Sequence, residues 1–422
     1  MEGGLKPQAA LLCCFIMEKL PQNMLDFIET NAGADVAALR LRYAGKSLGF
    51  DLDEALTQIE CRRRYNRKLA DTLASFPDFY FPTILAGEQS SSDRLAAWHA
   101  SFVAEGLPAA DLTAGLGIDV LHAAARASSV VAVEQQLSLA DALGFNARGL
   151  SVDNIEVVNG DCRAFVADCI ASGRRFATVF IDPARRAADG GRIYALADCS
   201  PDVTVMMPDL AKICDLLIIK ASPMLDIAHT ISAVEPRPRA VVASGTPTEC
   251  KEVVVLVDFA GKPVGETLVE AVTLHADGRV DKFSFLRSAE NEAPFVVGER
   301  AVAVGDYICE PSPALMKAGA LKLLARAYGL MCFTPNTRLL YGAAVPDGFP
   351  GTTYRVEEVL PYASSVIKRF SRRWPVAEVA VRNFDIGADE LRCRLGVRDG
   401  RDGVRVYGIK DGRNRPMLIV CR

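Results

Sequence analysis

A glycine-rich turn beside an acidic residue is the segment of this sequence that most clearly indicates a binding site. It reads Asp111-Leu112-Thr113-Ala114-Gly115-Leu116-Gly117-Ile118-Asp119, and it follows an apolar run and precedes a helical one. Glycines at such a turn let the backbone bend tightly and approach a ligand, while the start of the helix exposes amide groups. Val120 stands where the third glycine of the dinucleotide-binding fingerprint would be, so the turn needs support from other residues.

Acidic residues at the ends of four successive candidate strands supply that support. Asp111 belongs to the first strand, Glu134 closes the second, Asp161 follows the third and Asp182 ends the fourth. Glu134 comes 23 positions after Asp111, the place from which a carboxylate binds ribose hydroxyls. A single aspartate after a strand is more often a helix cap. Four acids at one edge of a parallel sheet, around a glycine-rich turn, favour a nucleoside site instead.

The strands that would carry these acids alternate with helical segments between about 106 and 260. The candidate strands are Ala109–Thr113, Val130–Glu134, Ile155–Asn159, Thr178–Asp182, Leu216–Lys220, Arg239–Ser244 and Val253–Phe259. Helical segments follow each of the first five, which predicts right-handed βαβ units and a mostly parallel sheet covered on both faces. The connection Gly245–Cys250 is too short for a helical crossover, so the last strand should run antiparallel.

The flanking regions differ in their predicted structure. Residues 1–105 read as helical, with a capping-box-like start at Asp51 and Glu54. One apolar stripe follows, made of Leu52, Leu56, Ile59, Leu69, Leu73 and Phe76. The basic run Arg62–Lys68 inside this stripe has two interpretations, contact with a nucleic-acid backbone and the commoner solvated helix face. Beyond 260 we expect β segments at Val264–Leu274 and Lys282–Leu286, a helix at Pro313–Tyr328 and a final strand at Met417–Val420.

The charge balance excludes a protein that is basic throughout, because 48 Lys and Arg against 52 Asp and Glu leave a net charge of −4 over 422 residues. The distribution is uneven. Residues 361–422 hold 14 basic and 7 acidic residues, a net of +7, so residues 1–360 carry −11. Basic and aromatic side chains interleave in this tail: Lys368, Arg369, Phe370, Arg372, Arg373 and Trp374. Such interleaving is typical of nucleic-acid-binding surfaces, although a solvated basic surface explains it too.

Cysteine usage and hydropathy bear on location. The twelve cysteines are scattered, without a C-x-x-C pair, which favours reduced thiols inside a cell. The four histidines form no zinc-binding spacing, so no metal is expected. The apolar run Ala9–Met17 ends at Glu18 and is interpreted as a buried segment rather than a signal peptide. No apolar run approaches the ~20 residues of a membrane helix. The sequence therefore predicts a cytoplasmic protein.

Residues 105–260 resemble the class I methyltransferases that use S-adenosylmethionine. The D-x-x-x-G-x-G turn is similar to their first motif, Glu134 to their ribose-binding acid, and Asp161 with Cys162 to the residues beside the adenine. Phe180–Arg186 is similar to their fourth motif, beside the transferable methyl group. The resemblance implies a Rossmann-like seven-stranded sheet that ends in a β-hairpin, and S-adenosylmethionine as the cofactor. The cofactor-binding residues that it implies are Asp111, Thr113, Ala114, Gly115, Gly117, Asp119, Glu134, Asp161, Cys162 and Asp182.

A narrower resemblance covers more of the chain. The Asp-Pro-Ala-Arg-Arg run, the segment Lys220–Asp226 and the segment Asp306–Pro311 resemble a bacterial group of methyltransferases with ferredoxin-like and THUMP-like domains. The catalytic domain of this group is similar to that of RNA-cap trimethylguanosine synthases. The implied fold class is α/β, with an N-terminal helical region and small α+β C-terminal domains. The implied domains are a helical region at 1–105, the methyltransferase domain at 106–260, a ferredoxin-like domain at 261–330 and a basic THUMP-like domain at 331–422.

The fourth motif departs from that of amino-methylating relatives. Those enzymes carry Asp-Pro-Pro and an aromatic residue, whereas here Ala184 and Arg185 follow Asp182 and Pro183. A guanidinium plane can stack on a base or bind phosphate in place of the aromatic ring. The 5-methyluridine enzymes add a cysteine after the fifth strand, where this chain has Ala221-Ser222-Pro223, so covalent activation of a pyrimidine is not expected.

The candidate catalytic residues are therefore Asp182, Pro183, Arg185 and Lys220. Lys220 either orients the substrate or forms a salt bridge inside the domain. Methyl transfer from a sulfonium is an in-line displacement, which needs positioning and exclusion of water more than catalytic side chains. Our first hypothesis is an RNA methyltransferase whose C-terminal domain delivers RNA to the crevice, with no membrane partner. The alternatives are a methyltransferase for a protein or small metabolite, and a non-catalytic protein that binds the cofactor and RNA.

Overall fold

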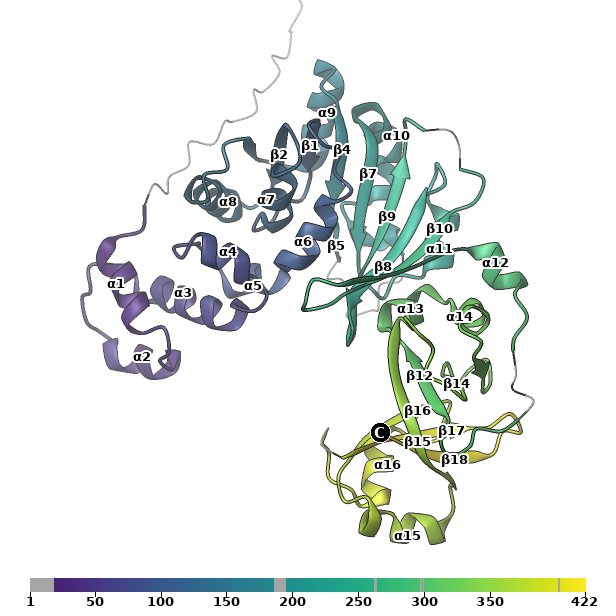
Figure 1. Ribbon diagram of the computed structural model, residues 1–422. Helices are drawn as coiled ribbons and strands as arrows, with labels where there is room; N and C mark the ends of the chain where they lie inside the picture. The colour runs from purple at the N-terminus through teal and green to yellow at the C-terminus, as the bar shows by residue number, and fades with distance from the viewer. Residues whose placement is uncertain (1–18, 186–194, 262–263, 297, 299, 401–402) are drawn as a thin grey trace, which may run out of the picture. The chain divides into compact units, whose positions relative to one another are not determined.

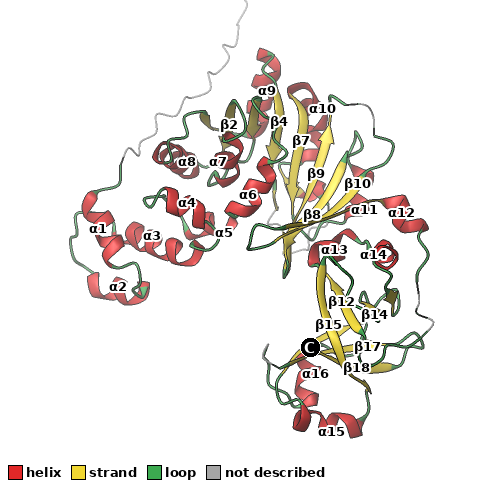
Figure 2. Cartoon of the chain, viewed as in Figure 1, coloured by secondary structure: helices red, strands yellow, loops and turns green. Residues whose placement is uncertain are grey.

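The computed structural model describes residues 19–422 apart from 186–194, 262–263, 297, 299 and 401–402. The apolar run Ala9–Met17 thus lies outside the described residues. Two units are distinguished: one runs to Arg239 and includes Val254–Gly265, and the other comprises Ala240–Val253 and Glu266–Arg422. Figures 1 and 2 show their helices and strands. Among the described residues, no helix is long and apolar enough to cross a membrane.

The N-terminal region of the first unit is helical, as predicted. Its helices are α1 (Gln22–Thr30), α2 (Val36–Tyr43), α3 (Leu52–Tyr65), α4 (Ala70–Ser75), α5 (Ile84–Gln89) and α6 (Asp93–Ala100). The predicted cap is confirmed, because the Asp51 carboxylate accepts a hydrogen bond from the Glu54 amide at 3.0 Å. The prediction of one continuous apolar stripe is wrong, because the segment from Leu52 to Phe76 forms two helices, α3 and α4, rather than one. Asp93 caps α4 separately by accepting the amides of Asp71 and Thr72 at 2.8 and 3.1 Å.

These N-terminal helices share a hydrophobic core with the helices of the sheet domain. Leu56, Ile59 and Phe81 belong to the same cluster of buried side chains as Ile118 and Phe145. The α3–α5 region is also tied internally, because the buried Gln58 side chain exchanges hydrogen bonds with the backbone of Phe81 at 2.8 and 3.0 Å. Residues 19–105 are therefore packed onto the first unit's sheet domain along a continuous apolar surface.

A parallel sheet forms the centre of the first unit. Its strands are β1 (Pro108–Asp111), β2 (Ser129–Glu134), β3 (Ile155–Asn159), β4 (Phe176–Ile181) and β7 (Cys214–Ala221). They pair in parallel in the order β3-β2-β1-β4-β7. The connecting helices are α7 (Ile118–Ala124), α8 (Leu137–Gly149), α9 (Cys162–Ser172) and α10 (Val203–Ile213).

The strand order reverses between β1 and β4. Successive right-handed crossovers lead from β1 to β2 and β3 and then back to β4 and β7, which places α7 and α8 on one face and α9 and α10 on the other. A ligand crevice forms at such a reversal, outside the carboxyl ends of the strands. Smaller elements follow β4 and β7: β5 (Ala184–Arg185), the 3₁₀ helix Leu196–Asp198, β6 (Cys199–Ser200) and α11 (Ile227–Ala233).

The seven strands that the resemblance implies are present, and two further strands extend the sheet to nine. The whole sheet reads β11-β10-β8-β9-β7-β4-β1-β2-β3, so β9 (Glu249–Asp258) lies between β7 and β8 (Ala240–Thr246). Only Pro247 and Thr248 join β8 to β9, which requires the antiparallel hairpin expected from the sequence. The β segments predicted beyond 260 become β10 (Leu268–Leu274), parallel to β8, and β11 (Val280–Leu286), antiparallel to β10.

The rest of the second unit contains a second, mostly antiparallel sheet. Its order is β13-β14-β12-β15-β18-β17-β16. The strands are β12 (Tyr307–Pro311), β13 (Met331–Cys332), β14 (Leu340–Gly342), β15 (Gly351–Pro361), β16 (Ala377–Arg382), β17 (Val404–Lys410) and β18 (Pro416–Cys421). The helices are α12 (Arg287–Glu292), α13 (Pro313–Ala318), α14 (Leu321–Ala327), α15 (Ser364–Arg373) and α16 (Ala388–Leu395).

One predicted helix of this unit is wrong. The segment Pro313–Tyr328 forms two helices rather than one, because Gly319 ends α13 with a left-handed φ of 81°. Leu321 then starts α14 in a new direction. The final strand is confirmed as β18, whose buried Leu418 and Val420 belong to the core beneath α15 and α16.

Candidate active site

The glycine-rich turn leaves the carboxyl end of β1 at the switch point. Gly117 caps α7 with φ of 87°, and a Cβ atom at this position would lie 2.1 Å from Cδ1 of Leu143. Gly115 also has a positive φ, 55°. Both the backbone conformation and the contact with α8 therefore require glycine at 117. The turn predicted from the sequence lies where the ligand crevice of a doubly wound sheet is expected.

Glu134 lies at the end of β2 and is bonded to this turn. Its carboxylate accepts hydrogen bonds from the amides of Gly115 at 2.8 Å and Gln136 at 2.7 Å. The end of β3 joins it, since the Asn159 side chain and the Gly160 amide donate to the Glu134 carbonyl at 2.9 and 3.1 Å. The ends of β1, β2 and β3 thus converge as the spacing of their acids predicts.

Asp111 is a buried carboxylate at the end of β1. One of its oxygens accepts the Thr113 amide at 2.9 Å. Burial raises the pKa of Asp111 to about 7, and the neighbouring charge of Asp119 adds to this shift, while the Thr113 amide and Lys220 oppose it. No partner of the second Asp111 oxygen is found among the described residues.

Asp161 and Cys162 begin α9. The Asp161 carboxylate accepts the amides of Arg163 at 2.8 Å and Ala164 at 3.3 Å, so it is the helix cap of α9. The Arg163 guanidinium, 3.0 Å away, and these amides lower the pKa of Asp161. Cys162 is buried, and burial raises the pKa of its thiol. Asp161 is therefore a helix cap, the commoner role of a single aspartate after a strand, and the proposed role beside the cofactor stays a prediction.

The fourth motif contacts the first through Thr113. The Asp182 amide donates to Oγ1 of Thr113 at 2.7 Å, and the Asp182 side chain is 46% exposed. Pro183 is buried. Arg185 belongs to β5, which pairs with β6 through Cys199, and its side chain lies outside what the structure describes.

Lys220, near the end of β7, lies between two carboxylates. Its Nζ atom is 2.7 Å from Oδ2 of Asp182 and 3.5 Å from Oδ2 of Asp119. It also donates to Oγ of Ser91 at 3.0 Å, and Ser91 in turn donates to Asp119 at 2.5 Å. Nδ1 of His99 lies 2.7 Å from the other Asp119 oxygen. The salt-bridge interpretation of Lys220 therefore describes this structure, with Asp182 as one partner.

The environment of Asp119 keeps this acid charged. Burial alone would raise its pKa, but the charges of Lys220 and His99 and the hydrogen bonds from His99 and Ser91 together lower the pKa well below its usual range. Sequence reasoning missed Ser91 and His99. Neither residue belongs to a motif described above, and both reach Asp119 only because α6 packs against α7.

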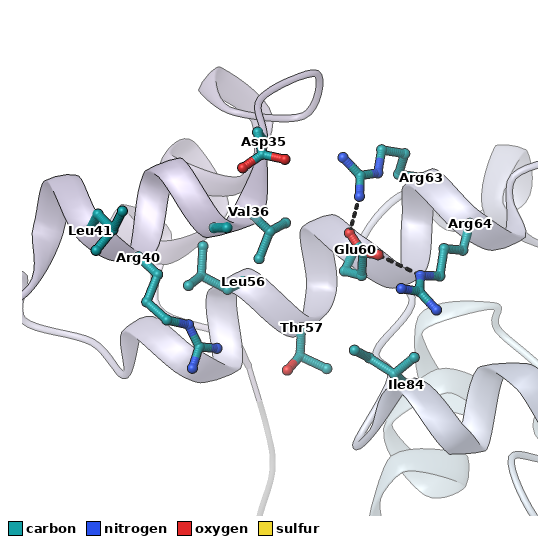
Figure 3. Close-up of a pocket in the computed structure, with 11 residues that line it drawn as sticks. Asp35, Val36, Arg40, Leu41, Leu56, Thr57, Glu60, Arg63, Arg64 and Ile84 are labelled. Carbon is teal, nitrogen blue, oxygen red and sulfur yellow. Dashed lines mark hydrogen bonds and ion pairs between the residues drawn. The ribbon is translucent and has the colours of Figure 1, made fainter.

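A cavity of about 600 Å³ lies elsewhere in the first unit, between α2, α3 and α5, and Figure 3 shows its lining. None of the predicted site residues lines it. Arg63 and Arg64 of the basic run reach this cavity, and both pair with Glu60 (Figure 3). Burial lowers the pKa of Arg62, which donates to the Phe79 carbonyl at 3.3 Å. These contacts favour the solvated or structural interpretation of the run over nucleic-acid contact.

Comparisons with known proteins agree with this fold. Residues 307–350 match a ferredoxin-like domain family, and residues 351–422 match a THUMP-like domain family. A protein from Porphyromonas gingivalis W83, whose crystal structure is described as that of a candidate methyltransferase, is 28% identical. The superposition covers 94% of this chain and 97% of that one, with a TM-score of 0.82. In fold and domain composition, the chain is similar to this candidate methyltransferase, and it carries matches to a ferredoxin-like and a THUMP-like domain family.

Proteins of two Mycobacterium tuberculosis strains, CDC 1551 / Oshkosh and H37Rv, are named uncharacterised S-adenosylmethionine-dependent methyltransferases. Each is 27% identical over 245 residues, which is 57% of this chain. The match spans 61% of the length of these relatives. The ferredoxin-like and THUMP-like matches begin at 307 and 351, later than the predicted borders at 261 and 331. The domain limits and the site residues of this chain stay predictions.

Proposed function

We propose that the chain transfers a methyl group from S-adenosylmethionine to RNA. The observation that carries the transfer is the 2.7 Å hydrogen bond from the Asp182 amide to Thr113, because it joins the proposed acceptor-side acid to the proposed cofactor turn. An in-line displacement requires the nucleophile and the methyl donor to be held at such a junction. The names of the two Mycobacterium tuberculosis relatives, which give S-adenosylmethionine, support the same cofactor.

The residues present suit this cofactor chemically. Asp111 is a buried carboxylate with a raised pKa, which a cationic ligand group would stabilise in its charged form. Glu134 accepts two amides and, as a carboxylate with about four acceptor positions, can accept ribose hydroxyls as well. Gly115 and Gly160 present backbone with open space where a side chain would stand. S-adenosylmethionine supplies a methyl group on a cationic sulfur, and these residues would bind and orient it.

On the acceptor side, Asp182 is the residue proposed to contact the substrate. Its Oδ2 atom pairs with Lys220 and its side chain is 46% exposed, so the second oxygen of this carboxylate can accept a hydrogen bond from the acceptor group. Pro183 fixes the backbone that follows and is itself buried. These residues orient a nucleophile without forming a covalent intermediate with it.

The RNA part of the proposal rests on the C-terminal helix α15. Lys368, Arg369 and Arg372 are exposed on one side of α15, at a spacing of three and four residues, and no ion pair is found for them in the described structure. Other basic residues nearby are neutralised: Arg392 pairs with Asp389, Arg394 with Glu390 and Arg415 with Asp411. An uncompensated basic helix face suits a phosphate backbone.

The aromatic residues of this segment have other roles than the interleaving pattern predicted. Phe370 is 3% exposed and belongs to the domain core. Trp374 donates to Glu358 at 3.2 Å, and the guanidinium groups of Arg373 and Arg422 lie 5.5 and 5.4 Å from its ring centroid. These rings are engaged within the domain, so α15 offers charge rather than stacking to RNA.

The test compares cells with and without this chain. Mass spectrometry of nucleosides from total tRNA and rRNA should reveal one methylated nucleoside that is lost in the deletion strain and restored by the wild-type gene. An Asp182→Asn gene should not restore it. Unchanged nucleosides, together with label from S-adenosylmethionine that appears only in protein or metabolites, would instead support the alternative acceptor class.

A further inference from the structure

Ser91 and His99 belong to the N-terminal helical region, outside the segment that resembles methyltransferases, yet they contact Asp119 at the end of the glycine-rich turn. Ser91 precedes α6 and His99 lies in its last turn. Both are buried, with exposed fractions of 6% and 1%. We propose that Ser91, His99 and Asp119 are positioning residues that hold Lys220 against Asp182, so that the N-terminal region forms part of the transfer site. This inference rests on the proposed methyl transfer.

The hydrogen bonds form a directed chain. Lys220 donates to Ser91, and the hydroxyl of Ser91, having accepted this bond, donates to Oδ2 of Asp119. His99 binds the opposite oxygen, Oδ1, so Asp119 is fixed from two sides. Because Asp119 is charged in this arrangement, its attraction keeps the Lys220 ammonium beside Asp182. These hydrogen bonds therefore determine where the Lys220 ammonium lies.

The ammonium in turn determines the orientation of Asp182. The Asp182 side chain is 46% exposed and would otherwise rotate freely, whereas the 2.7 Å contact with Lys220 fixes Oδ2. Oδ1 is then left to face the acceptor. Replacing Lys220 by an apolar residue would remove the positive charge that lies between the carboxylates of Asp119 and Asp182.

Packing contacts link α6 to α7 and to strand β4. The buried side chains of α6 pack against α7, which bears Asp119, and the His99 ring lies 6.5 Å from the ring of Phe180 on β4. Asp182 follows two residues after Phe180. A displacement of α6 would therefore move Asp119 and the base of the fourth motif together.

The competing explanation is that the network only stabilises the fold. A structural network and a positioning network differ in coupling, because residues that act through one another have non-additive effects on rate. The double variant His99→Gln/Lys220→Met should be no slower than Lys220→Met alone. A purely structural role predicts additive losses that follow the melting temperature.

The main experiment measures the initial rate of methyl incorporation from labelled S-adenosylmethionine into extract of the deletion strain, with and without ribonuclease. We expect Lys220→Met to lower the rate at least about 30-fold while S-adenosylhomocysteine affinity, by calorimetry, changes less than about threefold. Lys220→Arg should recover part of the rate, and Ser91→Ala should lose about three- to tenfold. Two surface variants are matched controls: Lys212→Met, whose lysine pairs with Asp209, and His229→Gln, whose histidine is exposed.

A second measurement does not depend on the acceptor. Acylation by an N-hydroxysuccinimide ester, followed by peptide mass spectrometry, should modify Lys220 at least about tenfold more slowly than Lys212. The Lys220 side chain is 18% exposed and is bonded to Asp182 and Ser91, whereas the Lys212 side chain is 57% exposed. Ser91→Ala should accelerate the reaction of Lys220 and leave that of Lys212 unchanged.

The outcomes separate the two proposals. Label that survives ribonuclease overturns RNA as the acceptor. The network is then tested by comparing the variants through the rate at which they incorporate this ribonuclease-resistant label. Additive losses, or a Lys220→Met rate within twofold of wild type, overturn the network. A wild-type protein that transfers no label at all overturns the proposed function, and acylation then decides the network: unchanged Lys220 reactivity in Ser91→Ala overturns it, and acceleration supports it.

Discussion

The carboxylate of Glu134 accepts a hydrogen bond from the amide of Gly115 at 2.8 Å. The acid that ends β2 is therefore bonded to the turn that leaves β1, although 19 positions separate them in the chain. This contact holds two of the proposed cofactor-binding elements together before a ligand arrives. Binding then requires little reorganisation, which favours affinity.

The first prediction concerns this acid. Glu134→Gln should weaken S-adenosylhomocysteine binding about 10- to 100-fold, because a hydrogen bond to a charged group contributes about 1.5–3 kcal/mol. Calorimetry measures the affinity. Glu156→Gln is the matched control. Glu156 is an exposed glutamate on β3 of the same sheet, and it pairs with Arg174. Equal affinity in Glu134→Gln and wild type would refute the assignment of Glu134 to the cofactor.

A second prediction separates binding from transfer. Asp182→Asn preserves the backbone amide that donates to Thr113, so the turn should stay in place. We expect cofactor affinity within about threefold of wild type and a rate of methyl transfer at least 100-fold lower, since an amide replaces the carboxylate that Lys220 orients. Should Asp182→Asn bind the cofactor poorly and turn over normally when saturated, the residue would belong to the cofactor site alone.

The raised pKa of Asp111 predicts a dependence of stability on pH. The folded-state pKa is about 7 and the unfolded value is near 3.8, so the fold binds the proton more tightly than the unfolded chain. Stability from this group is therefore present below about pH 4 and is lost as the pH rises toward 7, to a total of about 4 kcal/mol.

Asp111→Asn removes this titration. The difference in unfolding free energy between wild type and Asp111→Asn, measured in urea at pH 5 and pH 8, should change by a few kcal/mol in favour of the variant at pH 8. Other titrating groups cancel in this difference. A constant difference across the range would show that Asp111 is solvated in the folded protein.

The fourth prediction concerns Gly117. Gly117→Ala places a Cβ atom 2.1 Å from Leu143 and adds the strain of a left-handed backbone. Gly173→Ala is the matched control, because Gly173 has φ of 72° with nothing within 4 Å. We expect about 1–2 kcal/mol of lost stability in the control, from the backbone alone, and about 1–3 kcal/mol more in Gly117→Ala, from overpacking. Equal losses in chemical denaturation would mean that α8 moves aside.

The fifth prediction concerns the basic face of α15. Changing Lys368, Arg369 and Arg372 together to Gln should weaken RNA binding and reduce the slope of log affinity against log salt by about two to three. Changing the paired Arg392, Arg394 and Arg415 to Gln alters the net charge equally and serves as the control. Identical salt slopes for the two triple variants would show that net charge, rather than this face, drives binding.

Sequence reasoning predicted the parallel sheet and the convergence of its acids because both are encoded locally. Apolar runs at fixed spacing specify strands, and parallel strands bring their carboxyl ends to one edge, so Asp111, Glu134 and Asp182 meet without further information. The glycines of the turn were visible for the same reason, since their backbone conformation excludes other residues.

The remainder depended on contacts between distant segments. Asp93 divides the expected helix at α4 from 22 positions away, and no local pattern signals that cap. Gly319 did carry a local signal, as a glycine inside an amphipathic pattern, but the apolar spacing on both sides concealed it. Ser91 and His99 reach Asp119 only through packing of α6 on α7, so no local pattern in the sequence signals either contact.

The apolar surface shared by the N-terminal helices and the sheet domain means that neither part can be deleted without exposing the core of the other. A shortened chain that starts at residue 106 would leave side chains such as Ile118 and Phe145 facing water, and it would aggregate or unfold rather than report on catalysis. Loss of activity after such a deletion would therefore say nothing about the role of the N-terminal helices. Single substitutions inside the full chain are the informative route to that role.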